Sequence, residues 1–283
     1  MTEDFLSRMA AASRRRLEAS KAQCDEANMQ LIAEQRPAAT PLYLSAQGFD
    51  LIAEVKKRSP TAGDLATGTM SPVDQARHYA VAGAAAISVL TEPEQFDGAL
   101  TDLESIADAV AKRPSMRKDF LVSPYQIFEA RAAGAGGVLL IAAMLHAPQL
   151  RDMLQLTAEL CMFALVEVFD DIDLDNCLSV IEEIAPDMNK NEGQSEYRLL
   201  IGINCRDLRT LQVDFPRFEK MASLLPVGIP WVAESGVTSS EQAAHVARLG
   251  YRLALVGTSL MRAADPSVAV AAMISAGREV TKQ

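Results

Sequence analysis

The sequence has few of the residues that metal sites or disulfide frameworks require, and no long apolar run. Among 283 residues there are four cysteines and three histidines, and no two cysteines have CxxC spacing. The longer apolar runs, such as 84–90 and 136–145, fall far short of the ~20 residues of a membrane-spanning helix. The opening residues MTED are acidic where a signal peptide has an apolar core. We therefore expect a cytoplasmic protein with no structural zinc and scattered free thiols.

The charge balance is acidic. The formal net charge is −10 and the pI about 4.9, so the surface should repel phosphate backbones and anionic lipids. We expect neither nucleic acid nor a membrane as a partner. A hydrophobic fraction of 49% and a charged fraction of 23% exclude a disordered chain, a collagen and a coiled coil. A small anionic ligand stays possible because a pocket can be basic when the whole surface is not.

An N-terminal extension, residues 1–48, precedes the main domain at 49–283. Residues 2–36 predict a helix that ends before Pro37. The run Arg14-Arg15-Arg16 could mark a basic binding helix, but acidic neighbours nearly cancel it and favour a solvated face. The rough apolar stripe of this helix comprises Phe5, Met9, Ala12, Leu17, Cys24, Ala27, Leu31 and Ile32.

Beyond the extension, short apolar runs alternate with longer helical stretches. Continuous apolar runs separated by helices are typical of a parallel sheet that is buried on both faces. Eight units in about 235 residues indicate a (β/α)8 barrel, a TIM barrel. A doubly wound open sheet is the competing fold, but no GxGxxG follows the first run. Residues 187–196 predict a polar loop insertion. The expected strands are 51–55, 85–90, 115–118, 137–141, 163–168, 199–203, 231–233 and 253–256.

Polar side chains stand at the end of most expected strands, where barrel enzymes carry their active sites. Glu54 and Lys56 are two residues apart on a strand and therefore face the same way. A single such residue is usually a structural group, but this many charges at one mouth would be costly unless they formed a paired network suited to acid–base catalysis. The others are Lys118, Asp119, Glu167, Asn204, Arg206, Glu234 and Ser235.

Two glycine turns follow the last two expected strands, Ser235-Gly236 and Gly257-Thr258. Loops at these places in barrels commonly bind phosphate through backbone N–H groups. Each glycine alone is weak evidence because turns need glycine in any case. The pair predicts a phosphate site.

Seven segments in order resemble the indole-3-glycerol phosphate synthase family over nearly the whole chain. They are LIAEVKKRSP, SVLTEPEQFDG, MRKDFLVSPYQIFEARAAGA, ALVEV, IGINCRDLRTLQVD, VAESGV and LVGTSLMRAADP. The resemblance implies a TIM barrel with an extra N-terminal helix. It also implies decarboxylating ring closure of 1-(2-carboxyphenylamino)-1-deoxyribulose 5-phosphate to indole-3-glycerol phosphate in tryptophan biosynthesis, with no metal or organic cofactor.

The resemblance also assigns roles to strand-end residues. Lys118 matches the general acid and Glu167 the second acid–base residue, with Lys56 sharing that work. The residues expected to orient these groups are Glu54, Asn204 and Glu234. Arg206 with Ser59 matches the family's site for the anthranilate carboxylate. The role suits an arginine because a guanidinium can bind a carboxylate with two hydrogen bonds.

Further positions match the family's apolar slot and phosphate cradle. Plain core packing is the competing interpretation of each apolar residue. The slot comprises Phe96, Phe120, Leu139, Ile141, Leu208 and Leu211. The cradle comprises Ser235, Gly236, Gly257 and Thr258.

The sequence departs from the family pattern at Cys205, Ala62 and Thr258. Cys205 lies between two inward-facing residues and should point away from the site. One alternative is a catalytically impaired paralogue that binds a related phosphorylated ligand, although retained buried charges argue against it. A second is another barrel reaction on a phosphorylated sugar, by isomerisation or a lysine Schiff base. We expect a monomer or weak homodimer.

Overall fold

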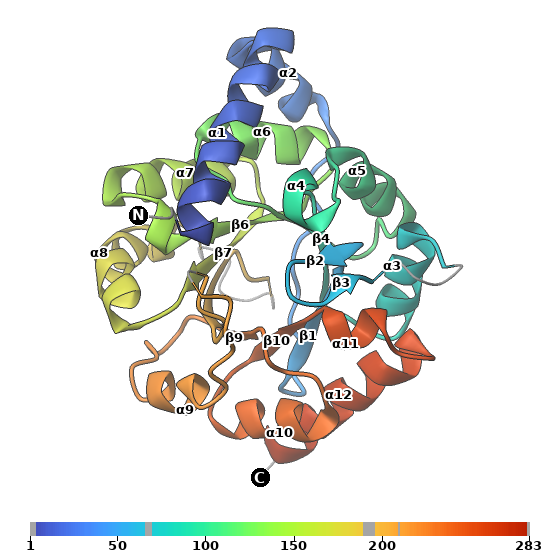
Figure 1. The fold of residues 1–283 in the computed structure, drawn as a ribbon. Coiled ribbons are helices and arrows are strands. Elements are labelled where there is room, and N and C mark those ends of the chain that lie inside the picture. The colour runs from blue at the N-terminus through green and yellow to red at the C-terminus, as the bar shows by residue number, and fades with distance from the viewer. Residues whose placement is uncertain (1–3, 66–69, 189–195, 209, 282–283) are drawn as a thin grey trace.

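The structure is a computed structural model that describes residues 4–65, 70–188, 196–208 and 210–281. Eight parallel strands close into a barrel in chain order, with helices around it (Figure 1). The TIM-barrel prediction is therefore confirmed. The strands are β1 (Asp50–Val55), β4 (Ala86–Leu90), β5 (Ser115–Lys118), β6 (Gly137–Ile141), β7 (Phe163–Val168), β8 (Leu199–Asn204), β9 (Trp231–Glu234) and β10 (Leu253–Val256).

The helices follow the strands as the apolar pattern predicts. Several begin with a side-chain cap, such as Ser71 ahead of α3 and Ser239 ahead of α10. None of the described helices is long and apolar enough to cross a bilayer. They are α3 (Pro72–Val81), α4 (Pro93–Phe96), α5 (Leu100–Ala109), α6 (Pro124–Ala132), η1 (Ala142–Met144), α7 (Ala147–Glu159), α8 (Asp171–Met188), α9 (Arg217–Ala222), α10 (Ser240–Arg248), α11 (Thr258–Met261) and α12 (Pro266–Thr281).

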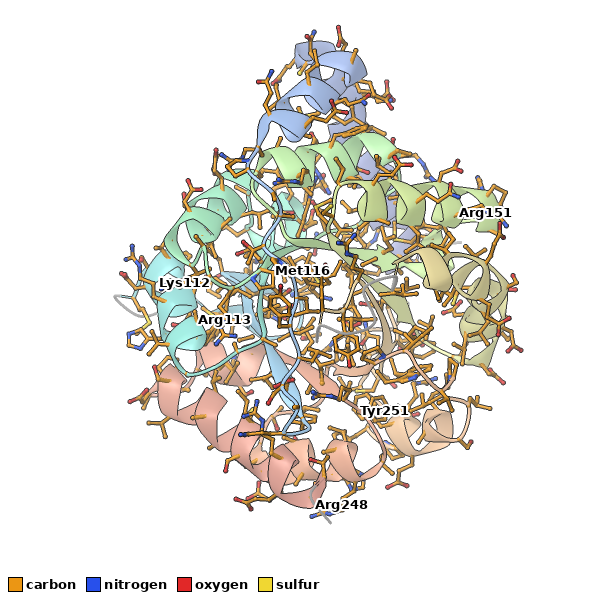
Figure 2. The ribbon with its side chains drawn as sticks, turned by 180° about the vertical axis from the view of Figure 1, so that it is seen from behind. Lys112, Arg113, Met116, Arg151, Arg248 and Tyr251 are labelled. Carbon is orange, nitrogen blue, oxygen red and sulfur yellow. The ribbon has the colours of Figure 1, made fainter. Side chains whose placement is uncertain are left out.

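Side-chain alternation along the strands separates two cores. In β1, Leu51, Ala53 and Val55 join the core between barrel and helices, while Ile52 belongs to the core inside the barrel. Figure 2 shows the molecule from behind, with Met116 of β5 near the middle of the ribbon. The inward-facing positions of β1 therefore continue from Ile52 to the polar residue Glu54 at the mouth of the barrel.

Three strands are longer than predicted. β1 begins at Asp50, β8 ends at Asn204 and β9 ends at Glu234. Each added residue is polar, so the apolar runs did not include it. Inside the barrel these polar groups are buried and find partners, which is why the strands can contain them.

The prediction of one helix over 2–36 is wrong. The structure has α1 (Phe5–Gln23) and α2 (Glu26–Gln35), because Asp25 accepts a hydrogen bond from the backbone of Asn28 and starts a second helix. The predicted stripe fails on α2, where Leu31 and Ile32 are exposed. On α1 it holds, since Phe5, Met9, Ala12 and Leu17 are buried.

The triple-arginine run is only partly solvated. Arg16 is 24% exposed and pairs with two buried carboxylates, so the prediction of a solvated face is wrong for this residue. The predicted loop 187–196 also needs correction at its start, because α8 continues to Met188. Residues 189–195 of that loop lie outside the described residues.

Short elements complete the mouth. After β1 the chain forms an antiparallel hairpin of β2 (Arg58–Ser59) and β3 (Gly63–Asp64). α1 contacts α6 through a hydrogen bond of 2.9 Å from Gln126 Nε2 to Ser13 Oγ, and α2, at the top of the view, packs against α6 (Figure 1). Phe5 joins the apolar cluster inside the barrel, so the extension contributes to the same core as the strands.

Candidate active site

A cavity of about 380 Å³ opens at the carboxyl end of the barrel strands. All eighteen residues predicted from the sequence to catalyse, bind substrate or bind phosphate contribute to its wall. They come from six of the barrel strands or from the loops that follow the strands, so that all eight strands contribute. The arrangement is the one expected for a TIM-barrel active site.

Lys118 lies at the centre of the charged cluster. Its Nζ is 3.4 Å from Oε2 of Glu167 and 3.3 Å from Oε2 of Glu234. Asn204 donates a hydrogen bond of 2.9 Å from Nδ2 to the other oxygen of Glu167. These side chains come from β5, β7, β8 and β9, whose inward positions bring them together.

A second lysine–glutamate pair lies on β1 and just beyond it. Lys56 Nζ is 2.5 Å from Glu54 Oε1, as their common orientation predicts. Both side chains are largely buried, with exposures of 12% for Lys56 and 3% for Glu54. Two lysines and three glutamates therefore share one mouth, and at least one glutamate oxygen faces each lysine Nζ.

The cluster shifts the pKa of two of its members. Burial would lower the pKa of Lys118, but the charges of Glu234, Glu167 and Glu54 outweigh it and hold that pKa above its ordinary value. Burial, assisted by the charge of Glu167, raises the pKa of Glu234 to about 8, although Lys118 opposes the shift. Lys118 is therefore an ammonium group at neutral pH, and Glu234 holds a proton over much of the physiological range.

Two glycines leave room for the carboxylates. A Cβ atom on Gly202 of β8 would lie under 3.0 Å from the carboxylate of Glu234, and one on Gly257 would clash in the same way with Glu54. Glu234 Oε1 is buried without a hydrogen-bond partner in the described part of the chain. Sequence reasoning missed the requirement for glycine at 202. The apolar pattern of β8 does not show that this position faces the side chain of Glu234 on the neighbouring strand.

Arg206 reaches the cavity from the loop after β8. Its Nη1 donates to the carbonyl oxygen of Leu211 at 2.8 Å and approaches Thr61 Oγ1 at 3.5 Å. Thr61 lies in the β2–β3 hairpin, where its hydroxyl is 3.3 Å from that of Ser59. Arg206 and Ser59 are thus linked through Thr61 at the mouth and can present a guanidinium and a hydroxyl to one anionic group.

The apolar side of the cavity contains all six residues predicted for the slot. Phe96 and Phe120 lie with ring centroids 6.4 Å apart. Phe120 also makes an edge contact with Phe5 of α1 at 6.0 Å. Phe5 lines the cavity and was not predicted, since it comes from the extension. The remaining predicted members are Leu139, Ile141, Leu208 and Leu211.

The glycine turns form the remaining wall. Ser235 and Gly236 both have positive φ values, 62° and 76°. Gly257 precedes the short helix α11, with Thr258 as its first residue. The hydroxyl of Ser259 is buried with no hydrogen-bond partner within the described ranges. Backbone N–H groups at such turns suit a phosphate group.

Cys205 points away from the cavity, as expected. It is fully buried in the core between barrel and helices, and its thiol donates to the carbonyl oxygen of Ser235 at 3.2 Å. Burial raises the pKa of the Cys205 thiol to about 12. This departure from the family pattern therefore packs beneath the Ser235 turn and adds no reactive thiolate.

Comparison with known proteins decides the family. The model of the indole-3-glycerol phosphate synthase family matches residues 6–273. The chain belongs to the indole-3-glycerol phosphate synthase family. Relatives of that name include one from a Nocardioides species, 42% identical and covering 86% of each chain, and one from Mycobacterium ulcerans, 43% identical and covering 83% of this chain and 79% of the relative.

Similarity to solved structures extends to other barrels. A 3-hexulose-6-phosphate synthase from Salmonella typhimurium has a TM-score of 0.60 at 12% identity, covering 82% of this chain and all of its own. Thiamine phosphate pyrophosphorylase from Pyrococcus furiosus has a TM-score of 0.56 at 15% identity, covering 83% and 99%. At these identities the likeness shows the fold alone.

In this member of the indole-3-glycerol phosphate synthase family, no group of three or more described His, Cys, Asp or Glu side chains is placed to hold a metal ion. Cavity residues missed at the sequence level come mostly from loops. Their apolar or small side chains carried no signal of chemistry. They are Phe5, Pro60, Thr61, Ala62, Leu90, Val213, Val237, Thr238, Leu255 and Ser259.

Proposed function

We propose a division of work among the cavity residues for the family's reaction. The chain is a carboxy-lyase of tryptophan biosynthesis that forms indole-3-glycerol phosphate, as its family membership shows. The reaction joins the carboxylate-bearing ring carbon of 1-(2-carboxyphenylamino)-1-deoxyribulose 5-phosphate to the ribulose carbonyl carbon. Carbon dioxide and then water leave, which completes the indole ring.

Lys118 acts as the general acid on the carbonyl oxygen. Attack on a carbonyl makes its oxygen more basic, so a charged donor nearby lowers the barrier. The raised pKa of Lys118 keeps this group protonated, whereas a Schiff-base lysine must be neutral. The observation that carries the proposal is the placement of Lys118 Nζ within 3.4 Å of both Glu167 and Glu234 in the cavity.

Glu167 and Lys56 serve the dehydration. The anilino nitrogen must lose a proton, and the leaving hydroxyl must gain one. Glu167 is held by Asn204 and Lys118, while Lys56 is held by Glu54. Glu54, Asn204 and Glu234 therefore orient these groups, and Glu54 also balances the charge of Lys56.

The substrate spans the cavity between two anion sites. Arg206 and Ser59 bind the anthranilate carboxylate, and the two glycine turns bind the phosphate. Between them the ring enters the apolar slot, where Phe96 and Phe120 contact it. After ring closure the carboxylate stands on a saturated ring carbon, so that when carbon dioxide leaves, the electrons of the broken C–C bond return to the ring and restore its aromaticity.

We place the enzyme in the cytoplasm as a monomer or weak homodimer. The four cysteines are free thiols, which suits a reducing compartment. Sedimentation of the purified protein across a concentration series tests the oligomeric state. A stable tetramer or larger assembly would contradict it.

A steady-state assay with the anilino-ribulose phosphate tests the function. Formation of the indole product is followed by its fluorescence, with EDTA present. We expect turnover that survives the chelator and disappears in Lys118→Ala. Substrate binding without turnover would instead identify a catalytically impaired paralogue. A covalent adduct trapped by borohydride would contradict the acid–base role of Lys118.

A further inference from the structure

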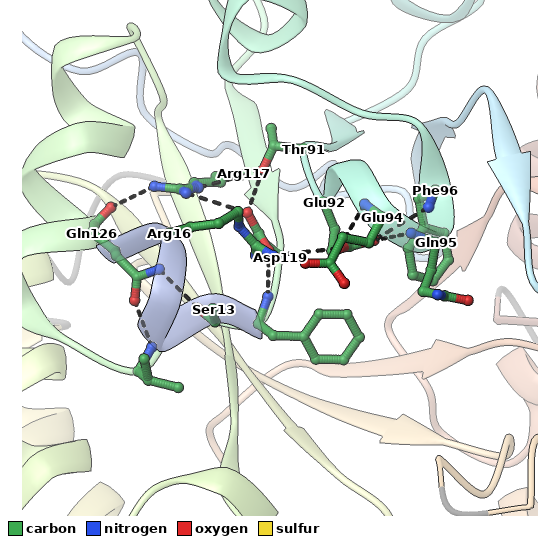
Figure 3. Close-up of polar contacts among 12 residues, drawn as sticks. Ser13, Arg16, Thr91, Glu92, Glu94, Gln95, Phe96, Arg117, Asp119 and Gln126 are labelled. Atoms are coloured by element: carbon green, nitrogen blue, oxygen red, sulfur yellow. Dashed lines mark hydrogen bonds and ion pairs between the residues drawn. The ribbon is translucent and has the colours of Figure 1, made fainter. Parts of the chain in front are cut away.

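A network of buried charges links α1 to the loops that carry the slot. Arg16 on α1 donates from Nη2 to Asp119 Oδ1 at 2.7 Å and from Nη1 to Glu92 Oε1 at 3.4 Å (Figure 3). The two carboxylates follow β5 and β4, and their side chains are 1% and 0% exposed. One guanidinium therefore joins two barrel loops to α1 through buried carboxylates, whereas the ion pair of Arg15 on α1 with Glu94 of α4 lies at the surface.

Each carboxylate also holds the backbone of a phenylalanine of the slot. Asp119 Oδ1 accepts a hydrogen bond of 2.8 Å from the N–H of Phe120. Glu92 caps α4 and accepts one of 3.2 Å from the N–H of Phe96. The oxygen of Asp119 that binds Arg16 is the same oxygen that holds Phe120. A shift of Arg16 would therefore move the backbone of Phe96 through Glu92 and the backbone of Phe120 through Asp119.

Asp119 has a second cation and a hydroxyl as further partners, whereas the other partners of Glu92 are the backbone N–H groups of Glu94, Gln95 and Phe96 in α4. Asp119 Oδ2 also accepts from Thr91 at 2.9 Å and from Arg117 at 3.2 Å. Within the described chain, Arg16 is the one cation paired with Glu92. Because a buried carboxylate that loses its cation is costly, Glu92 would rearrange toward water when Arg16 is removed. The α4 turn that carries Phe96 would move with it.

We propose that Arg16 is a positioning residue that sets the width of the aromatic slot. It acts through Glu92 on Phe96 and through Asp119 on Phe120, and Phe5 of the same helix closes the edge of the slot. The proposal rests on the proposed function, in which this slot receives the anthranilate ring. It gives the N-terminal helix a specific part in recognising the aromatic half of the substrate.

Two inhibitors separate this role from a general structural one. The first is the substrate reduced at its carbonyl, which keeps the ring. The second is inorganic phosphate, which occupies the glycine turns alone. For Arg16→Ala we expect KM and the inhibition constant of the ring-bearing inhibitor to rise about tenfold, the loss expected for a hydrogen bond to a charged group. Inhibition by phosphate should stay within about twofold of wild type.

Matched variants sharpen the test. Arg15→Ala removes a neighbouring arginine that is 68% exposed and pairs with Glu94 at the surface, so it should leave both constants unchanged. Arg16→Lys should fall between wild type and Arg16→Ala, because it keeps the positive charge but replaces the two Nη atoms that each meet one carboxylate with a single nitrogen. Guanidinium chloride at millimolar concentration should lower the KM of Arg16→Ala and leave that of Arg15→Ala unchanged.

The results that would overturn the proposal are distinct from failure of the synthase activity. An unchanged KM in Arg16→Ala, or an equal loss of both inhibitors, contradicts positioning of the slot. If wild type shows no turnover, the proposed function fails, and calorimetric binding of the two inhibitors still decides the role of Arg16. Should Arg16→Ala be insoluble, Arg16→Lys with the same inhibitors carries the test.

Discussion

The carboxylate of Glu54 occupies the space that a side chain at Gly257 would need. A methyl group there would displace Glu54 and with it the ion pair to Lys56. We expect Gly257→Ala to lower kcat at least about tenfold, or ~1.4 kcal/mol in the barrier. Steady-state kinetics on the folded variant check this. An unchanged kcat together with a higher KM would instead assign Gly257 to phosphate binding alone.

Lys118→Ala should abolish most turnover without loss of the fold. Removing a general acid lowers the rate ~10²–10⁴-fold. The direct partners of Lys118 are two glutamates, so neither of them is a second ammonium group that could replace it. Lys112→Ala is the control, because that exposed lysine lies away from the cavity at the back of the molecule (Figure 2). Thermal melting compares the folds, and near-normal turnover in Lys118→Ala would remove it from the mechanism.

Glu234 should give the enzyme a pH dependence near pH 8. Below its pKa of about 8 the carboxyl is neutral, and above it a new charge binds the Lys118 proton more tightly and weakens the acid. We expect kcat/KM to fall as pH rises through about 8. Glu234→Gln stays neutral and should lose that fall; a fall that persists in the variant points to another group.

The same group should affect stability in a defined direction. Its pKa is raised from 4.5 to about 8 in the folded chain, so the native state holds a proton that the unfolded chain releases. The free energy of unfolding should therefore decrease between about pH 4.5 and pH 8. Denaturant titrations of wild type and Glu234→Gln check this, and a decrease equal in both would contradict it.

Arg206→Ala should weaken substrate binding and spare product binding. The substrate carries the anthranilate carboxylate, whereas indole-3-glycerol phosphate has lost it as carbon dioxide. We expect KM to rise about 10- to 100-fold, as for a charge-assisted hydrogen bond, with the product inhibition constant unchanged. Arg248→Ala, on α10 and exposed, is the control. Equal weakening of substrate and product would place Arg206 elsewhere on the ligand.

The period of two along buried strands made the barrel and its mouth readable from sequence. Once Ile52 is assigned to the interior, Glu54 must face the same way, and the same reasoning brings Glu167 and Glu234 toward one axis. Capping residues gave less help, because Asp25 lies within a helical pattern and its role as the start of α2 appears only in space.

The burial of Arg16 could not be predicted in this way. Its partners Glu92 and Asp119 are 76 and 103 residues away in the chain. Local charge patterning suggested neutralisation by neighbouring acids, whereas the fold supplies distant ones. Phe5 was missed for the same reason, since its place in the cavity depends on where α1 packs.

The start of α1 and the end of α12 lie at opposite faces of the barrel. Phe5 borders the cavity, whereas α12 packs against the first residues of β1, where Arg278 pairs with Asp50 at 2.7 Å. An affinity tag fused ahead of α1 would therefore lie next to the substrate entrance. A tag, tether or fusion partner at the C-terminus would leave that entrance open, and an enzyme immobilised through it would present its mouth to the solution.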